Sequence, residues 1–115
     1  MKTICFDLDG VLCETKNGNY LNSKPKKKVI NLINKLYSKG YKIIIFTARF
    51  MGRTNNNYTQ AKRKAKKLTI DQLKSWNLKY HEIYFGKPSY DFFIDDKSIF
   101  FKKDWYLKFE KKVLN

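Results

Sequence analysis

The sequence predicts an α/β fold built around a mainly parallel sheet, and three observations carry this prediction. Short apolar runs alternate with segments of helical periodicity along nearly the whole chain. The apolar runs show little alternation of polar and apolar residues, which is typical of buried parallel strands. Several of the runs also end in acidic or hydroxyl residues, and parallel sheets bind ligands at the carboxyl ends of their strands.

The first strand, helix and strand are predicted over residues 2–46. Residues 2–7 form an apolar run that ends in an acid, which predicts a buried strand, and glycine, asparagine and proline mark residues 8–25 as a loop. From Lys26 apolar residues recur at helical spacing, and we expect Ser23 to cap this helix and Gly40 to end it. Residues 41–46 predict a second strand that is covered on both faces.

The second half continues the same alternation. Residues 50–58 predict a polar loop and residues 58–67 a basic helix. Thr69 and Gln72 resemble a capping box with Leu68 and Leu73 as its hydrophobic staple, so a helix over 70–76 is expected to continue or abut the basic one. Two more short strands and a closing amphipathic helix are predicted over 82–85, 91–94 and 103–114, although the connection between the two strands is too short for a parallel crossover.

Length and composition limit what the chain can be. With 115 residues, 43% of them hydrophobic, we expect a single domain over residues 1–115 with a sizeable core. No apolar stretch is long enough for a membrane span, and two early aspartates do not fit a signal peptide, so we expect a cytoplasmic protein. The net charge of +15 attracts phosphates on small molecules, nucleic acid or lipids without choosing among them.

Several reactive residues are assigned to ordinary structural roles. Cys5 lies in an apolar run and is expected to pack as a small hydrophobe. Its separation from Cys13 fits neither a redox nor a zinc pattern. We expect His81 to serve packing or face solvent rather than bind a metal, and Trp76 and Trp105 to pack in the core or between helices rather than stack on bases.

Two acids close the first predicted strand. Asp7 ends it and Asp9 follows two residues later, so both carboxylates can face one small volume, and Gly10 allows a sharp turn there. Acids at such an edge can hold a divalent cation, attack an electrophile or pass a proton. By themselves they are equally consistent with an Asp-rich turn.

Matching groups lie at the ends of other predicted strands. The second strand ends in a hydroxyl and a guanidinium, the loop after the third carries an ammonium, and the last ends in two carboxylates: Thr47, Arg49, Lys87, Asp95 and Asp96. All of them fall at one edge of the predicted sheet, and we therefore interpret them as one site.

This ordered set resembles the signature of the haloacid dehalogenase (HAD) superfamily, which combines D-x-D-G, a strand-terminal Ser or Thr, a loop Lys and a strand-terminal acidic pair. The matching segments, FDLDGV, FT, GKP and FIDDK, lie in that order within residues 3–97. The segments FDLDG, TAR, YHEIYFGKP and IDDK are also similar to the small phosphatases of capsule and surface-polysaccharide biosynthesis. The resemblance implies a three-layer, Rossmann-like core.

The resemblance also implies a role for each residue. Asp7 would be the nucleophile that forms an aspartyl phosphate, and Asp9 would protonate the leaving alcohol and later activate water. Mg²⁺ would be held by Asp7, the backbone carbonyl of Asp9 and Asp95, with Asp96 in support directly or through water. The groups that would hold the phosphoryl oxygens are Thr47 and Lys87.

The positions where a cap domain would be inserted, residues 11–25 and 48–57, are only loops, so we expect a capless, open site. Such a site accepts a bulky substrate or takes a lid from another subunit of a homo-oligomer. The residues expected nearest the leaving group are Tyr20, Arg49, Phe50 and Arg53.

The leading hypothesis is a Mg²⁺-dependent phosphatase for a small sugar, polyol or amino-alcohol phosphate of capsule or surface-polysaccharide biosynthesis. A phosphatase for nucleotides or nucleic-acid ends is the first alternative, since an open basic site suits a polyanion. A non-catalytic phosphate-binding module is the second. The presence of Asp7, Asp9, Lys87 and Asp95 together argues against it, because binding alone does not require a proton donor two residues from a nucleophile.

Overall fold

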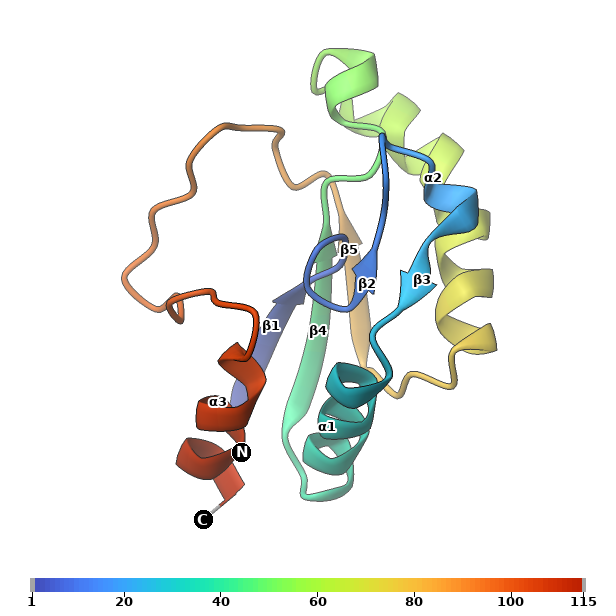
Figure 1. Cartoon of the computed structure of the whole chain (residues 1–115). Coiled ribbons are helices and arrows are strands. Elements are labelled where there is room, and N and C mark those ends of the chain that lie inside the picture. Colours follow the sequence, from blue (N-terminus) through green and yellow to red (C-terminus); the bar gives the residue numbers. More distant parts are fainter. Residues whose placement is uncertain (1, 115) are drawn as a thin grey trace.

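The computed structural model describes residues 2–114 and is organised around a parallel sheet (Figure 1). The sheet has three strands in the order β1-β4-β5, namely β1 (Thr3–Asp7), β4 (Lys42–Thr47) and β5 (Glu82–Phe85). Both outer strands pair with β4 in parallel. The predicted α/β class with a parallel sheet is confirmed, and these strands lie within one residue of their predicted bounds.

Three helices accompany the sheet: α1 (Lys27–Ser38), α2 (Tyr58–Ser75) and α3 (Trp105–Leu114). α1 lies in the connection from β1 to β4 and α2 in the connection from β4 to β5, as parallel neighbours require. Gly40, with a φ of +96°, ends α1 as predicted, since glycine tolerates this left-handed conformation. None of the helices in residues 2–114 has the length and apolar character needed to cross a membrane.

The predicted loop over residues 8–25 contains a small hairpin. Its strands are β2 (Cys13–Glu14) and β3 (Lys24–Pro25), with the 3-10 turn η1 (Tyr20–Asn22) between them, and a second such turn, η2 (Gly52–Thr54), follows β4. The expected cap of α1 by Ser23 is wrong, because α1 is capped at Lys26. The Ser23 hydroxyl is instead hydrogen-bonded to that of Thr15 at 2.6 Å.

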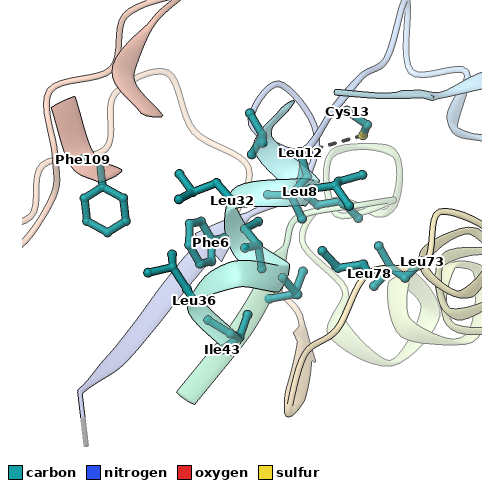
Figure 2. Packing of buried hydrophobic residues seen from close by; sticks show 14 of the residues in the cluster. Phe6, Leu8, Leu12, Cys13, Leu32, Leu36, Ile43, Leu73, Leu78 and Phe109 are labelled. Carbon is teal, nitrogen blue, oxygen red and sulfur yellow. Dashed lines mark hydrogen bonds between the residues drawn. The ribbon is translucent and has the colours of Figure 1, made fainter. Parts of the chain in front are cut away.

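The core lies between one row of sheet side chains and the helices. In β4, Ile43 and Ile45 are fully buried, whereas the alternate residues Ile44 and Phe46 are only half-buried. The expectation that this strand is covered on both faces is therefore not met, because all three helices share a core with the same row (Figure 2). The cluster also includes Phe6, Leu8, Leu12, Leu32, Leu36, Leu73, Leu78, Trp105 and Phe109.

The tryptophans lie in or against this core, whereas His81 is exposed and packs on one neighbouring ring. The His81 ring stacks on Tyr37 with 4.5 Å between centroids, and its Nδ1 accepts the backbone N–H of Ile43 at 3.0 Å. Trp105 lies in the core cluster, and Trp76 packs against it. These roles of His81 and both tryptophans agree with the sequence analysis.

The last predicted strand, over residues 91–94, is not formed. This part of the chain belongs to a wide loop that leaves β5 and returns at α3 (Figure 1). Phe92 and Ile94 are 87% and 96% exposed, so most of the apolar run that predicted the strand is not packed against the core. The connection from β5 is too short for a crossover that would place this run parallel to its neighbours.

Replacing Phe109 by alanine tests the attachment of α3 to the core. Because the ring is only 9% exposed, we expect Phe109→Ala to lower the free energy of unfolding by about 3–5 kcal/mol. The control, Leu107→Ala in the same helix, removes a side chain that is 51% exposed and should cost less than about 1 kcal/mol. Urea denaturation measures both, and equal losses would contradict this placement of α3.

Candidate active site

The parallel register brings three distant segments to one edge of the sheet. Asp7 is paired with Phe46 at the ends of β1 and β4, and Thr47 is paired with Phe85 at the ends of β4 and β5. Two residues beyond β5, the backbone N–H of Lys87 donates to the carbonyl of Thr47 at 3.1 Å. The end of β1 and the loop after β5 are therefore fixed relative to β4 by backbone pairing.

Asp7 and Lys87 form an ion pair at this edge. Lys87 Nζ lies 3.5 Å from Asp7 Oδ2, and Asp7 Oδ1 accepts the backbone N–H of Leu8 at 2.8 Å. The side chain of Asp7 is 34% exposed and that of Lys87 is 9% exposed. An incoming ligand can therefore reach the carboxylate, and the sequence-based expectation that these two residues meet is fulfilled.

Burial shapes the charge of both groups. It raises the pKa of Asp7, and the nearby positive charge of Lys87 offsets only part of that increase. Burial also lowers the pKa of Lys87, but the Tyr90 side chain and the Asp7 carboxylate outweigh it, so that this pKa is raised overall. The Lys87 ammonium also lies 4.7 Å from the ring centroid of Phe93. A protonated, partly desolvated amine of this kind is suited to hold an anion.

Asp9 is held by the guanidinium of Arg49 rather than standing free. Arg49 Nε donates to Asp9 Oδ2 and Nη2 donates to Oδ1, each at 3.0 Å. The Arg49 side chain is completely buried, which corrects the expectation that it touches the leaving group. A buried guanidinium needs partners for its N–H groups, and these lie inside the molecule.

Two of those partners are Thr69 and Gln72, and their role shows that the predicted capping box is wrong. Thr69 Oγ1 and Gln72 Oε1 accept from Arg49 Nη1 at 3.2 and 2.5 Å. Both residues lie inside α2, whose N-cap is Asn57, with a side chain that accepts the Gln60 backbone N–H at 3.0 Å. A Thr and a Gln three positions apart share one helix face. This spacing was the signal in the sequence that could have indicated a shared polar partner, which the structure identifies as Arg49.

Thr47 lies at the predicted strand end, but its side chain is fully buried. Its hydroxyl accepts the backbone N–H of Arg49 at 3.1 Å. Unlike Asp7, Thr47 is not accessible to solvent in this arrangement. Its backbone carbonyl contributes to the site by accepting the backbone N–H of Lys87.

The two loops where a cap would be inserted contact one another. The rings of Tyr20 and Phe50 lie 4.9 Å apart, and the Arg53 guanidinium lies 4.8 Å from the first and 4.9 Å from the second. Arg53 also donates to the carbonyl of Gly18. Phe50 adopts a φ of +65°, a costly conformation for a bulky residue, directly after Arg49.

The acidic pair at 95–96 is not brought to Asp7. Both residues are exposed on the wide loop, and Asp95 Oδ1 accepts the Lys97 backbone N–H at 2.8 Å, as in an Asx turn. Within residues 2–114 no three His, Cys, Asp or Glu side chains are grouped so as to hold a metal ion. Of the four predicted metal ligands, Asp7, Asp9, Asp95 and Asp96, Asp7 is the one whose carboxylate fits: it is accessible at the strand edge.

The expectation that Cys5 packs as a small hydrophobe is wrong. Cys5 is exposed, because it lies in the sheet row opposite Phe6, whereas Cys13 is fully buried. Cys13 Sγ donates to Asp9 Oδ1 at 3.5 Å. Burial and the charge of Asp9 raise the pKa of Cys13 to about 11.

Comparisons with known proteins bear on the fold. No protein-family model matches the sequence, and no curated protein matches it. The structure is similar to the crystal structure of a structural-genomics target from Vibrio cholerae, with 28% identity, a TM-score of 0.80, and coverage of 97% of this chain and 99% of that one.

A second similar structure is that of D,D-heptose 1,7-bisphosphate phosphatase from B. bronchiseptica, crystallised with magnesium and phosphate. It shows 14% identity and a TM-score of 0.54, and the match covers all of this chain (100%) but 65% of that one. The chain thus spans about two thirds of the length of that phosphatase. The chain described here has a HAD-like, Rossmann-type fold, as the resemblance of its motifs predicted.

The buried thiol of Cys13 predicts a pH-dependent stability. Between the ordinary thiol pKa of 9.0 and about 11 the folded state keeps a proton that the unfolded state loses, so the free energy of unfolding falls as pH rises. We expect this contribution to approach about 1.4 kcal/mol per pH unit. In urea denaturation Cys13→Ala should flatten the fall more than Cys5→Ala does, because Cys13 is fully buried whereas Cys5, whose pKa burial also raises, is exposed. An unchanged slope in Cys13→Ala would contradict the assignment.

Proposed function

We propose that the chain is a HAD-type phosphatase that hydrolyses phosphate monoesters through an aspartyl phosphate on Asp7. The observation that carries the proposal is an accessible Asp7 carboxylate, ion-paired with the buried Lys87 and two residues from Asp9, at the carboxyl end of β1. The order of the motifs along the chain supports it, and so does the fold. A module that only binds phosphate would not need a proton donor, Asp9, two residues from a nucleophile, Asp7.

The proposed reaction has two steps. An oxygen of Asp7 attacks phosphorus, the ester P–O bond breaks, and the leaving alkoxide takes a proton from Asp9. A water then loses a proton to Asp9 and attacks phosphorus, which releases phosphate and restores Asp7. The Lys87 ammonium holds the phosphoryl oxygens, and Thr47 would join it only if its buried hydroxyl turns toward the substrate. A carboxylate repels a phosphate charge ~4 Å away by about 4 kcal/mol at an effective dielectric of 20, and the Lys87 ammonium opposes this.

Mg²⁺ is part of the proposal, since proteins bind it through one or two carboxylates, with waters and substrate phosphates completing the shell. Asp7 and the backbone carbonyl of Asp9 would hold the ion. When bound, the ion supplies positive charge that offsets the phosphate dianion. Asp95 and Asp96 would join as ligands only if the wide loop carries them to Asp7.

For the substrate we propose a small sugar, polyol or amino-alcohol phosphate used in capsule or surface-polysaccharide biosynthesis, in a cytoplasmic, single-domain enzyme. The similarity of FDLDG, TAR, YHEIYFGKP and IDDK to the capsule phosphatases supports this class. The stack of Tyr20, Phe50 and Arg53 supplies aromatic and cationic surface of the kind that recognises such molecules. A second subunit would complete the lid.

A phosphatase for nucleic-acid ends is a second candidate, which the surface of α2 favours. One face of this helix is a shallow basic depression that begins at Tyr58 and is lined by Lys62, Arg63, Lys66 and Lys67. The Tyr58 ring lies directly against Gly86, beside Lys87. A phosphodiester chain whose end occupies the site would therefore find cationic groups along α2.

Replacing the nucleophile tests the reaction itself. Asp7→Asn should reduce hydrolysis of p-nitrophenyl phosphate by at least about 10³-fold, because amide nitrogen and oxygen cannot form the acyl phosphate. EDTA should abolish hydrolysis by the wild-type chain, and added Mg²⁺ should restore it. Asp91→Asn, which removes an exposed acid outside the site, is the control. Full activity in a folded Asp7→Asn variant would refute the assignment.

Asp95→Asn tests whether the wide loop delivers a metal ligand. If Asp95 joins the site during turnover, the Mg²⁺ concentration for half-maximal activity should rise by about tenfold or more. Asp104→Asn, another exposed acid before α3, should leave that concentration unchanged. An Asp95→Asn variant with wild-type Mg²⁺ dependence would exclude Asp95 as a ligand.

Salt dependence separates the two substrate classes. Four phosphate contacts along α2 would weaken binding of a single-stranded, phosphate-terminated oligonucleotide roughly 50-fold between 50 and 200 mM salt. Hydrolysis of a small monoester should change far less. The comparison is made on KM for each substrate, and an oligonucleotide KM that is insensitive to salt would eliminate the nucleic-acid candidate.

A further inference from the structure

We infer that Arg49 is a positioning residue that orients Asp9 for proton transfer, an inference that rests on the proposed phosphatase function. Arg49 reaches both oxygens of the Asp9 carboxylate through Nε and Nη2. Its side chain is completely buried, while that of Asp9 is 26% exposed. The guanidinium thus contacts Asp9 from inside the molecule and leaves the outer side of the carboxylate open.

The hydrogen bonds distinguish the two oxygens of Asp9. Oδ1 accepts from Arg49 Nη2 at 3.0 Å, from the Thr15 hydroxyl at 2.6 Å and from Cys13 Sγ at 3.5 Å. For Oδ2 the hydrogen bond among the described residues is the one from Arg49 Nε at 3.0 Å. Since a carboxylate oxygen has two main acceptor sites, Oδ1 is saturated and Oδ2 is the oxygen with capacity for a substrate.

Arg49 is itself held from two sides. Thr69 and Gln72 of α2 accept from Nη1, and the Ser23 hydroxyl accepts from Nη2 at 3.2 Å. The Tyr20 ring lies 5.0 Å from the guanidinium carbon. The Gln72 side chain also donates to the Tyr20 carbonyl at 2.5 Å. The direction of Asp9 therefore depends on how α2 and residues 20–23 are packed around one planar group.

Orientation matters for a proton donor because transfer requires heavy atoms within about 2.6–3.2 Å. Without the two-point contact to Arg49, the Asp9 carboxylate is held through Oδ1 alone, by Thr15 and Cys13, and fewer encounters place Oδ2 at the leaving oxygen. A loss of this kind depends on the leaving group. A nitrophenolate departs without a proton, whereas an alkoxide needs one, so only the alkyl ester reports on the orientation of Asp9.

The experiment compares p-nitrophenyl phosphate with glycerol phosphate in the presence of Mg²⁺. We expect Arg49→Met to lower kcat on glycerol phosphate at least about tenfold more than on p-nitrophenyl phosphate. Asp9→Asn should show the same bias, and the double variant should show no more bias than Asp9→Asn alone. Arg49→Lys keeps the charge without the planar fork, and its bias should be intermediate. Lys108→Met, which removes an exposed charge on α3, should show none.

Arg49→Met removes a buried charge and can impair folding, so Thr69→Val is the second variant. It keeps the shape of the side chain, does not contact Asp9 in the hydrogen-bond network, and removes one acceptor of Arg49. A smaller bias of the same sign in folded Thr69→Val supports the inference. Equal loss on both esters in Arg49→Met and Thr69→Val, with bias retained in Asp9→Asn, overturns it and leaves the phosphatase intact. Inactive wild type on both esters overturns the proposed function and this inference with it.

Discussion

The guanidinium of Arg49 is a charge withdrawn from water, and the segments around it are arranged as its partners. Asp9 comes from the turn after β1, Ser23 from the hairpin and Thr69 from α2. Removing the Asp9 carboxylate would leave an uncompensated buried charge, which costs far more than an exposed ion pair contributes. The positions of α2 and of residues 20–23 relative to β1 are thus tied to a single side chain.

Backbone pairing performs the complementary task. The register of β1, β4 and β5 decides which residues meet at the sheet edge, and the bond from the Lys87 N–H to the Thr47 carbonyl extends that register beyond the strands. Side-chain contacts then decide how the groups point. Asp7 meets Lys87 through the first arrangement, and Asp9 meets Arg49 through the second. The edge therefore holds an accessible carboxylate beside a restrained one.

The elements that could be predicted from the sequence are those with local causes. Apolar runs and helical spacing located the strands of the sheet and all three helices, and strand ends located Asp7 and Lys87. The inward turn of Arg49 could not be read locally, because its partners lie 20 or more residues away. Thr69 with Gln72 carries the same spacing as a capping box, and the apolar run at 91–94 reads as a strand whether or not a partner exists.

The sheet itself ends abruptly at β1. Among residues 2–114 this strand is hydrogen-bonded to β4 on one side, and Thr3 and Cys5 on it are exposed. An unpaired edge strand is a template for edge-to-edge pairing with another chain, a hazard that proteins counter with charged side chains. A net charge of +15 makes copies of the chain repel one another, which opposes indiscriminate pairing of such edges. The excess of lysine thus opposes aggregation of the chain through the unpaired edge of β1.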